Sequence, residues 1–288
     1  MRHFLSGLKL EIPAMNQRGA ISGAHAAMSH GWDWMPANGS RHGFVLDHLM
    51  NGDLVLLLGL LVLAHLLLLW GPLRRRKTDH GSVSEAHSRK IFTVEIAALC
   101  ALCVVYAWMT LDAQRLWATD RYTGPSPAAL QVEVVGTQFH WYFRYPGRDA
   151  AFGHTKPELV DPAGGNPLGI DPADAAGHDD FVSSVLVLPA GREVDLTLRS
   201  QDVIHGFFIP GMRLKQDAVP GLVLHLHFTP VSAGVFPIVC SQLCGMGHEH
   251  MQASLRVISP AEYTAWLAGR DRAAAAAEAA SAAAGAGQ

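Results

Sequence analysis

The sequence predicts a two-helix transmembrane hairpin followed by an all-β domain of the Greek-key sandwich or barrel type. Two apolar runs lie before residue 112, and a series of short β-rich segments follows residue 120. Hydrophobic residues make up 49% of the 288-residue chain and charged residues only 16%, and the apolar excess is concentrated in the two runs. This concentration indicates membrane segments rather than an unusually large core.

The hairpin is predicted over residues 51–112, with helices at about 54–70 and 91–110. A helix needs about 20 apolar residues to cross a bilayer, and each run approaches that length. The connection 71–90 is rich in Lys and Arg, and short basic loops stay on the cytoplasmic side. We therefore expect a multi-pass protein of the cell inner (plasma) membrane, with its β domain on the periplasmic side.

Two ionisable residues lie inside the predicted helices. His65 is in the first and Glu95 is near the start of the second. Burying such groups in lipid is costly, so each is either functional or hydrogen-bonded to a partner subunit. Cys100 and Cys103 share one face of the second helix and are interpreted as small buried hydrophobes.

The β domain is predicted over residues 120–262, because its segments are short, rich in β-branched and aromatic residues, and bounded by Gly, Pro and Asp. An insertion at 146–180 has no periodicity and is expected to be a loop. Residues 1–50 are expected to form a poorly structured leader, and 273–288 an Ala-rich tail. The predicted strands are 130–136, 138–145, 184–188, 193–199, 222–228, 235–240 and 252–258.

The chemistry is concentrated in the run 240–251, which reads CSQLCGMGHEHM. Cys240, Cys244, His248 and Met251 combine thiolates, imidazole and thioether, a donor set that selects copper. Zinc competes for such sites but seldom takes methionine. A single blue copper uses one cysteine, so two cysteines favour two coppers bridged by thiolates. The second histidine is expected to be His205, in a turn between two predicted strands.

These motifs resemble cytochrome c oxidase subunit II. The resemblance is carried by the run 240–251, by DVIH ending at His205, and by LKQDAVPG ending at Gly221. It implies a cupredoxin fold with a dinuclear copper (CuA) centre bridged by Cys240 and Cys244. His205 and Met251 would complete one copper, and His248 with the backbone carbonyl of Gln242 the other.

The sequence departs from the family at two places. Gln242 stands where many members have a Glu that also helps to bind magnesium at the subunit I interface. An amide oxygen still suits that hard cation, so a magnesium site at Gln242 is a further expectation. The aromatic run 138–145 reads QFHWYFRY, so Phe139 replaces the first tryptophan, the family's electron-entry residue, and Trp141 keeps the second position. Phe139 and Trp141 are the candidates for electron entry.

The resemblance implies subunit II of a terminal respiratory oxidase, which passes electrons from a c-type cytochrome to haem in subunit I while oxygen is reduced and protons are translocated. The chain alone is not expected to reduce oxygen. Further expected partners are subunit III and copper chaperones, and Glu95 matches a proton-entry carboxylate. The net charge of −3 gives no reason to expect nucleic acid binding. Acidic residues of the insertion are expected to dock the cytochrome: Asp149, Glu158, Asp171, Asp179 and Asp180.

Three other readings compete with this one. The copper domain of nitrous oxide reductase would need a propeller domain, and a quinol oxidase subunit II would lack the copper ligands. A membrane-tethered copper-delivery protein would explain the ligands, but it would not explain the spacing of His205 or the LKQDAVPG stretch.

Overall fold

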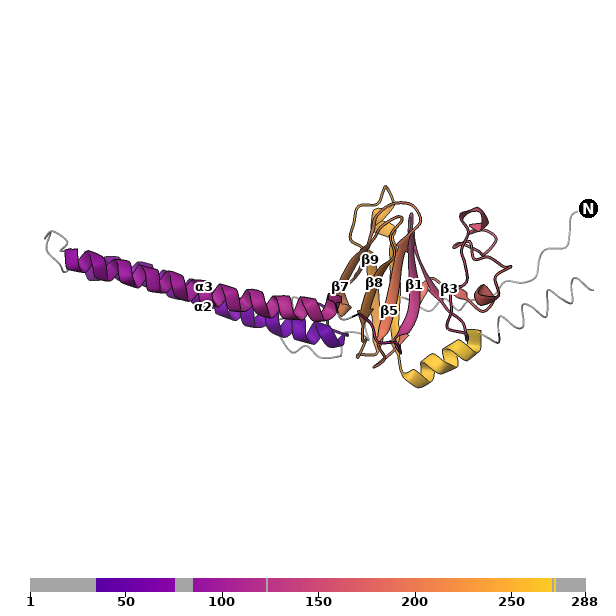
Figure 1. Cartoon of the computed structure of the whole chain (residues 1–288), viewed down its shortest axis with the longest axis horizontal. Coiled ribbons are helices and arrows are strands. Elements are labelled where there is room, and N and C mark those ends of the chain that lie inside the picture. Colours follow the sequence, from indigo (N-terminus) through magenta and orange to yellow (C-terminus); the bar gives the residue numbers. More distant parts are fainter. Residues whose placement is uncertain (1–34, 76–84, 123, 271, 273–288) are drawn as a thin grey trace, which may run out of the picture.

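The computed structural model describes residues 35–75, 85–122, 124–270 and 272. Two long helices, α2 (Arg41–Arg75) and α3 (Glu85–Tyr122), run side by side and project from one end of a β domain (Figure 1). Both are long and apolar enough to cross a membrane, over Arg41–Gly71 and Phe92–Ala118. They are longer than predicted, because each continues beyond its apolar run into polar sequence. The predicted leader therefore ends before Arg41, and residues 1–34 lie outside the described part.

The β domain is a sandwich of two five-stranded sheets, which confirms the predicted fold class. One sheet has the order β3-β2-β1-β5-β8, and the other has the order β4-β10-β9-β6-β7. The pairings β1–β5 and β4–β10 are parallel, and the remaining pairings are antiparallel. The strands are β1 (Leu130–Thr137), β2 (His140–Tyr145), β3 (Phe181–Ser183), β4 (Val185–Pro189), β5 (Val194–Ser200), β6 (His205–Ile209), β7 (Leu214–Ala218), β8 (Leu224–Phe228), β9 (Gly234–Cys240) and β10 (Gln252–Ile258).

Strands β3, β6 and β7 are absent from the sequence prediction. In β6 the side chains are buried on both faces, so the apolar–polar alternation that marks a half-buried strand is missing. The prediction that His205 lies in a turn was therefore wrong, since His205 is the first residue of β6. Fixing this histidine to a strand gives it a more rigid backbone than a turn would.

The segment before α2 ties the hairpin to the sandwich. The Ser40 hydroxyl accepts a hydrogen bond from the Gly43 amide at 3.1 Å and so caps the helix. The same hydroxyl donates to the Met212 carbonyl at 2.8 Å. The Arg213 guanidinium binds both oxygens of Asp47, at 2.8 and 3.0 Å. The first helix therefore enters the β domain through several bonds rather than through a loose linker.

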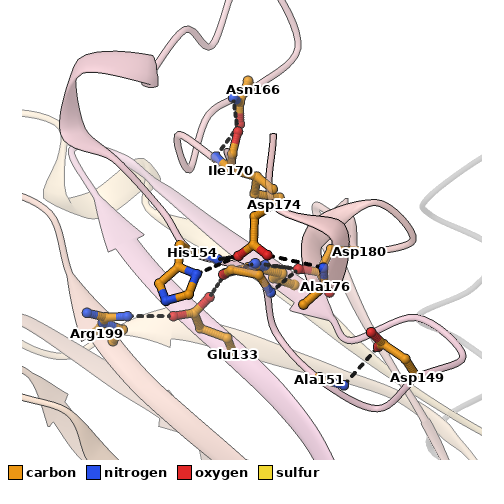
Figure 2. A network of polar contacts seen from close by, with 12 residues as sticks. Glu133, Asp149, Ala151, His154, Asn166, Ile170, Asp174, Ala176, Asp180 and Arg199 are labelled. Atoms are coloured by element: carbon orange, nitrogen blue, oxygen red, sulfur yellow. Dashed lines mark hydrogen bonds and ion pairs between the residues drawn. The ribbon is translucent and has the colours of Figure 1, made fainter. Parts of the chain in front are cut away.

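The insertion 146–180 is attached to the first sheet by a buried ionic network. Arg144 is only 1% exposed, and its guanidinium contacts Glu133 at 3.1 Å, Asp180, and the Gly153 carbonyl at 2.6 Å. Arg199 also pairs with Glu133, at 3.2 Å, as Figure 2 shows. Buried charges are tolerated only when paired in this way, so the network fixes where the insertion begins and ends.

The insertion 146–180 holds two short 3-10 helices, η2 (Pro157–Leu159) and η3 (Ala175–Gly177). Residues 260–270 form a helix beyond the predicted domain end. Its Trp266 packs edge-on against Tyr145, with ring centroids 5.2 Å apart, and against Phe181 at 5.5 Å. The predicted tail 273–288 lies outside the described residues.

Candidate metal centre

Three connections meet at one end of the sandwich. They are the β9–β10 loop, the β5–β6 loop and the tight β1–β2 turn, so both sheets contribute. Strand β9 ends at Cys240, and its loop contains a single 3-10 turn, η5 (His248–His250), before β10. Backbone bonds close the loop, since the Cys240 amide donates to the Met251 carbonyl at 3.2 Å. The rigid sheets therefore hold both ends of the β9–β10 loop.

The predicted ligands of this loop converge on Cys244. Its Sγ lies 3.8 Å from Cys240 Sγ, 3.6 Å from His248 Nδ1 and 3.8 Å from Met251 Sδ. Cys240 Sγ is 3.1 Å from the backbone oxygen of Gln242. Both cysteines and Met251 are buried. Five donors within a few ångströms, two of them thiols with no disulfide between them, form a preassembled soft-metal site.

His205 completes the cluster from the neighbouring loop and strand. One ligand atom from each of His205, Cys240 and Cys244 can be placed so that all three lie within 4.8 Å of one another. The imidazole is fully buried, yet its Nδ1 has no hydrogen-bond partner among the described residues. A buried polar atom without a partner costs free energy unless a ligand or metal satisfies it. The residues present therefore fit a bound copper.

Asp202 orients His205, and the sequence prediction did not single it out. Its Oδ1 lies 2.7 Å from His205 Nε2, leaving Nδ1 for a metal. It also accepts hydrogen bonds from the amides of Gln138 and Val203, each at 2.7 Å. Burial opposes ionisation, but these hydrogen bonds lower the pKa of Asp202. A carboxylate three residues before a candidate ligand was the available signal, since metal-bound histidines usually donate their other nitrogen to such a group.

The Cys244 thiol needs a nearby cation to ionise at neutral pH. Burial and the neighbouring Cys240 thiol raise the pKa of Cys244 to about 11. A metal ligand must be deprotonated, and a nearby metal ion's charge is what lowers a thiol's pKa. Metal binding at this pair should therefore release protons.

The β1–β2 turn packs directly against the β9–β10 loop, here called the metal loop (residues 241–251). The Gln138 amide group donates to the Cys244 carbonyl at 2.6 Å. Phe139 is partly buried and packs so tightly that a Cβ added at Gly247 would lie 2.5 Å from its ring. Trp141 is 2% exposed and meets His205 edge-on, with centroids 5.8 Å apart. Phe139 thus contacts the outer loop, whereas Trp141 lies beneath it in the core.

The remaining predicted residues are spread over the molecule. The Gln242 side chain is exposed on the metal loop, and Glu95 is exposed on α3, away from the cluster. In the insertion, Asp149, Glu158 and Asp179 are exposed, whereas Asp171 pairs with Lys156 at 2.6 Å.

The prediction for Asp180 requires a correction. The carboxylate of Asp180 has no exposed surface and is paired with Arg144, so the prediction that it docks a partner was wrong. On β8, His225 pairs with Asp195 at 3.0 Å and His227 lies 3.8 Å from Glu193, and His227 lines a cavity against the helical hairpin.

A β-sandwich that gathers cysteines, histidines and a methionine at one end, behind two membrane-length helices, is a cupredoxin-type copper domain on a helical anchor. Residues 130–258 match the family model described as the periplasmic domain of cytochrome c oxidase subunit II. This part of the chain is therefore similar to the periplasmic domain of cytochrome c oxidase subunit II.

Two curated relatives and one solved structure are similar to parts of this chain. The chain is 40% identical over 141 residues to the alternative cytochrome c oxidase subunit 2 of Bradyrhizobium diazoefficiens, covering 48% of this chain and 50% of the relative. It is 33% identical over 150 residues to subunit 2 of Cereibacter sphaeroides, covering 49% of each. The crystal structure of the periplasmic domain of subunit II from Bradyrhizobium japonicum covers 52% of this chain and 98% of that domain, with 24% identity and a TM-score of 0.38. The chain thus spans about half the length of the curated relatives it matches.

Proposed function

We propose that this chain is subunit II of a haem–copper terminal oxidase and receives electrons at a dinuclear copper centre. The observation that carries the proposal is the convergence of both cysteines, both histidines and Met251 at one end of the sandwich. When bound there, a thiolate-bridged copper pair supplies reversible one-electron transfer. A site with one cysteine would suit a mononuclear blue copper, and the second cysteine favours the bridged pair.

The protein's own residues fix the positions of the candidate ligands. Cys240 and Met251 are joined by a backbone hydrogen bond, and His205 is fixed by Asp202 on the first residue of a strand. A site built on strands and supported by second-layer hydrogen bonds keeps its geometry when its charge changes. Small rearrangement between redox states favours fast electron transfer.

Phe139 and Trp141 lie at different depths and therefore have different roles in electron entry. Phe139 packs against Gly247 of the metal loop and is partly exposed, so a docked donor would touch it first. Trp141 contacts His205 but is buried, so it would act within the protein rather than at the donor's surface. We assign electron entry to Phe139 and an inner coupling role to Trp141.

The other partners follow from this assignment. The donor is a c-type cytochrome that the exposed acids Asp149, Glu158 and Asp179 help to steer. The acceptor is haem in subunit I, in an assembly with subunit III, and proteins that reduce and deliver copper load the site. The exposed Gln242 amide faces a magnesium ion at the subunit I interface, and Glu95 marks a proton entry. The chain lies in the cell inner membrane with the copper domain on the periplasmic side.

The test is copper stoichiometry and electron paramagnetic resonance on the full chain in detergent. The proposal predicts two coppers per chain and the hyperfine pattern of one unpaired electron shared by two equivalent copper nuclei. Cys240→Ser should abolish that pattern, whereas Cys100→Ser, on the exposed surface of α3, should leave it unchanged. One copper with the pattern of a single nucleus would instead support a membrane-tethered copper-delivery protein.

A further inference from the structure

A cavity of about 580 Å³ lies where the helical hairpin meets the β domain, away from the metal loop. Its volume falls within the range of about 300–1,000 Å³ that is usual for small-molecule sites. Val45 and Leu49 of α2, Leu116 of α3 and Phe228 of β8 give it an apolar lining. A cavity built from both helices and the sandwich suits a ligand that is partly embedded in the membrane.

The end of the cavity nearest the apolar runs, at Leu49 and Arg115, lies at the level of lipid headgroups. The apolar runs begin at Leu54 on α2 and end near Thr110 on α3. Leu49 and Arg115 each lie five residues beyond these ends, which is about 7.5 Å at 1.5 Å per residue. The headgroup region adds roughly 5–7 Å on each side of the hydrocarbon core. This depth of the cavity in the membrane rests on the proposed function, in which the hairpin crosses the bilayer.

Charges of both signs line this apolar cavity. Arg41 and Arg115 supply guanidinium groups, while Asp112 and Glu193 supply carboxylates. Glu193 Oε1 lies 3.8 Å from His227 Nδ1 and 3.4 Å from the Ser126 amide.

The two histidines on the wall, His42 and His227, add ring nitrogens to these charges. The buried Nε2 of His227 has no hydrogen-bond partner among the residues that the structure describes. A buried donor or acceptor of this kind usually marks a place where a ligand or water binds.

We propose that this cavity binds the headgroup of a zwitterionic phospholipid that carries a primary ammonium, such as phosphatidylethanolamine. The phosphate lies against Arg115, because guanidinium groups bind phosphate oxygens through paired hydrogen bonds. The ammonium lies against Asp112 and Glu193, and the glycerol and first acyl carbons cover the apolar wall. An anionic headgroup without an ammonium would leave both carboxylates unmatched, and a choline headgroup would offer them no N–H donor.

The test measures lipid retention by the full chain in nanodiscs that contain phosphatidylcholine with phosphatidylethanolamine or phosphatidylglycerol. Native mass spectrometry after detergent extraction counts the lipid that stays bound. We expect phosphatidylethanolamine to be retained about tenfold better than either other lipid, the size expected for one charge-assisted hydrogen bond. Equal retention of the lipids would overturn the proposal, as would a second copy of the chain seated in the cavity.

Variants separate the two halves of the headgroup. Arg115→Gln should weaken retention of every phospholipid about tenfold, whereas Asp112→Asn, which leaves Glu193 in place, should reduce only the preference for ethanolamine over choline. Arg256→Gln, on the exposed face of β10, is the matched control and should change neither. Unchanged retention in both cavity variants would refute the assignment.

Copper content and resistance to alkaline extraction are measured on the same samples. Loss of membrane association would refute the hairpin on which the proposal rests. Intact association and copper binding without lipid preference would refute the lipid site alone.

Discussion

Replacement of Gly247 by alanine tests how closely the aromatic turn and the metal loop are coupled. The backbone at Gly247 has φ −105° and ψ 15°, which an alanine can adopt. The added methyl group, however, would lie 2.5 Å and 2.8 Å from carbons of the Phe139 ring. Either the ring or the loop must therefore move.

The expected cost combines two opposing effects. Overpacking of this kind costs about 1–3 kcal/mol. The smaller conformational entropy of alanine in the unfolded chain returns about 0.4–1 kcal/mol. We therefore expect Gly247→Ala to lower the free energy of unfolding by about 0.5–2 kcal/mol, and to speed the loss of copper to a chelator because the loop carries His248.

A double-mutant cycle isolates the cause. In a Phe139→Ala background the clash is gone, so Gly247→Ala should be neutral or slightly stabilising, and the coupling free energy should be about 1–3 kcal/mol. The free energy of unfolding is measured in detergent for four copper-loaded full-length chains: the parent, the two single variants and the double variant. If Gly247→Ala has the same effect in both backgrounds, the inferred contact does not govern the loop.

Three further outcomes are expected. Asp202→Asn should weaken copper affinity about 10- to 100-fold in a competitive chelator titration, because Asp202 orients His205 through a 2.7 Å contact; unchanged affinity would contradict this role. Arg144→Met should lower the free energy of unfolding by about 3–5 kcal/mol, because it leaves buried carboxylates unpaired, and an unchanged denaturant midpoint would refute the network. Hydrogen bonds from the His154 amide and ring, and from another backbone amide, hold the pKa of Asp174 down to about 2. Because this folded-state pKa is depressed, the stabilisation is present above about pH 4 and is lost as the pH falls toward 2. The rate at which pepsin cuts the insertion should therefore rise more steeply below pH 3 in the native chain than in an Asp174→Asn variant, which lacks this titration. An equal rise in both chains would contradict the role of Asp174.

The candidate metal ligands of the β9–β10 loop could be grouped from the sequence because their spacing is local. The spacing of Cys240, Cys244, His248 and Met251 places four soft donors in one loop, and few metals other than copper use that set. The structure adds that His205 lies on a strand and that its Nδ1 is left without a partner.

The supporting residues could not be predicted, because their partners are distant in sequence. Gln138 contacts Cys244 across 106 positions, and Arg213 contacts Asp47 across 166. Contacts between residues so far apart leave no periodic pattern in the sequence. The same holds for Asp180, which looked like a surface acid among others in its loop, although its partner is the buried Arg144 of β2. The extra length of α2 was also missed, since its first turns are polar and depend on the Ser40 cap and the sandwich for stability.

The residues that precede α2 have a practical consequence for dissecting this protein. The Gly39 amide donates to the Gly211 carbonyl at 2.7 Å, and the Gly39 carbonyl accepts from the Val231 amide at 2.7 Å. A residue that precedes both helices in the sequence is therefore bonded to the β domain that follows them. The folding unit is therefore discontinuous along the chain. A soluble fragment that starts after α3 would strip those backbone groups of their partners and uncover Phe236 and Met212, which pack against Gly39. Joining residues 35–40 to such a fragment through a short flexible linker should restore its solubility.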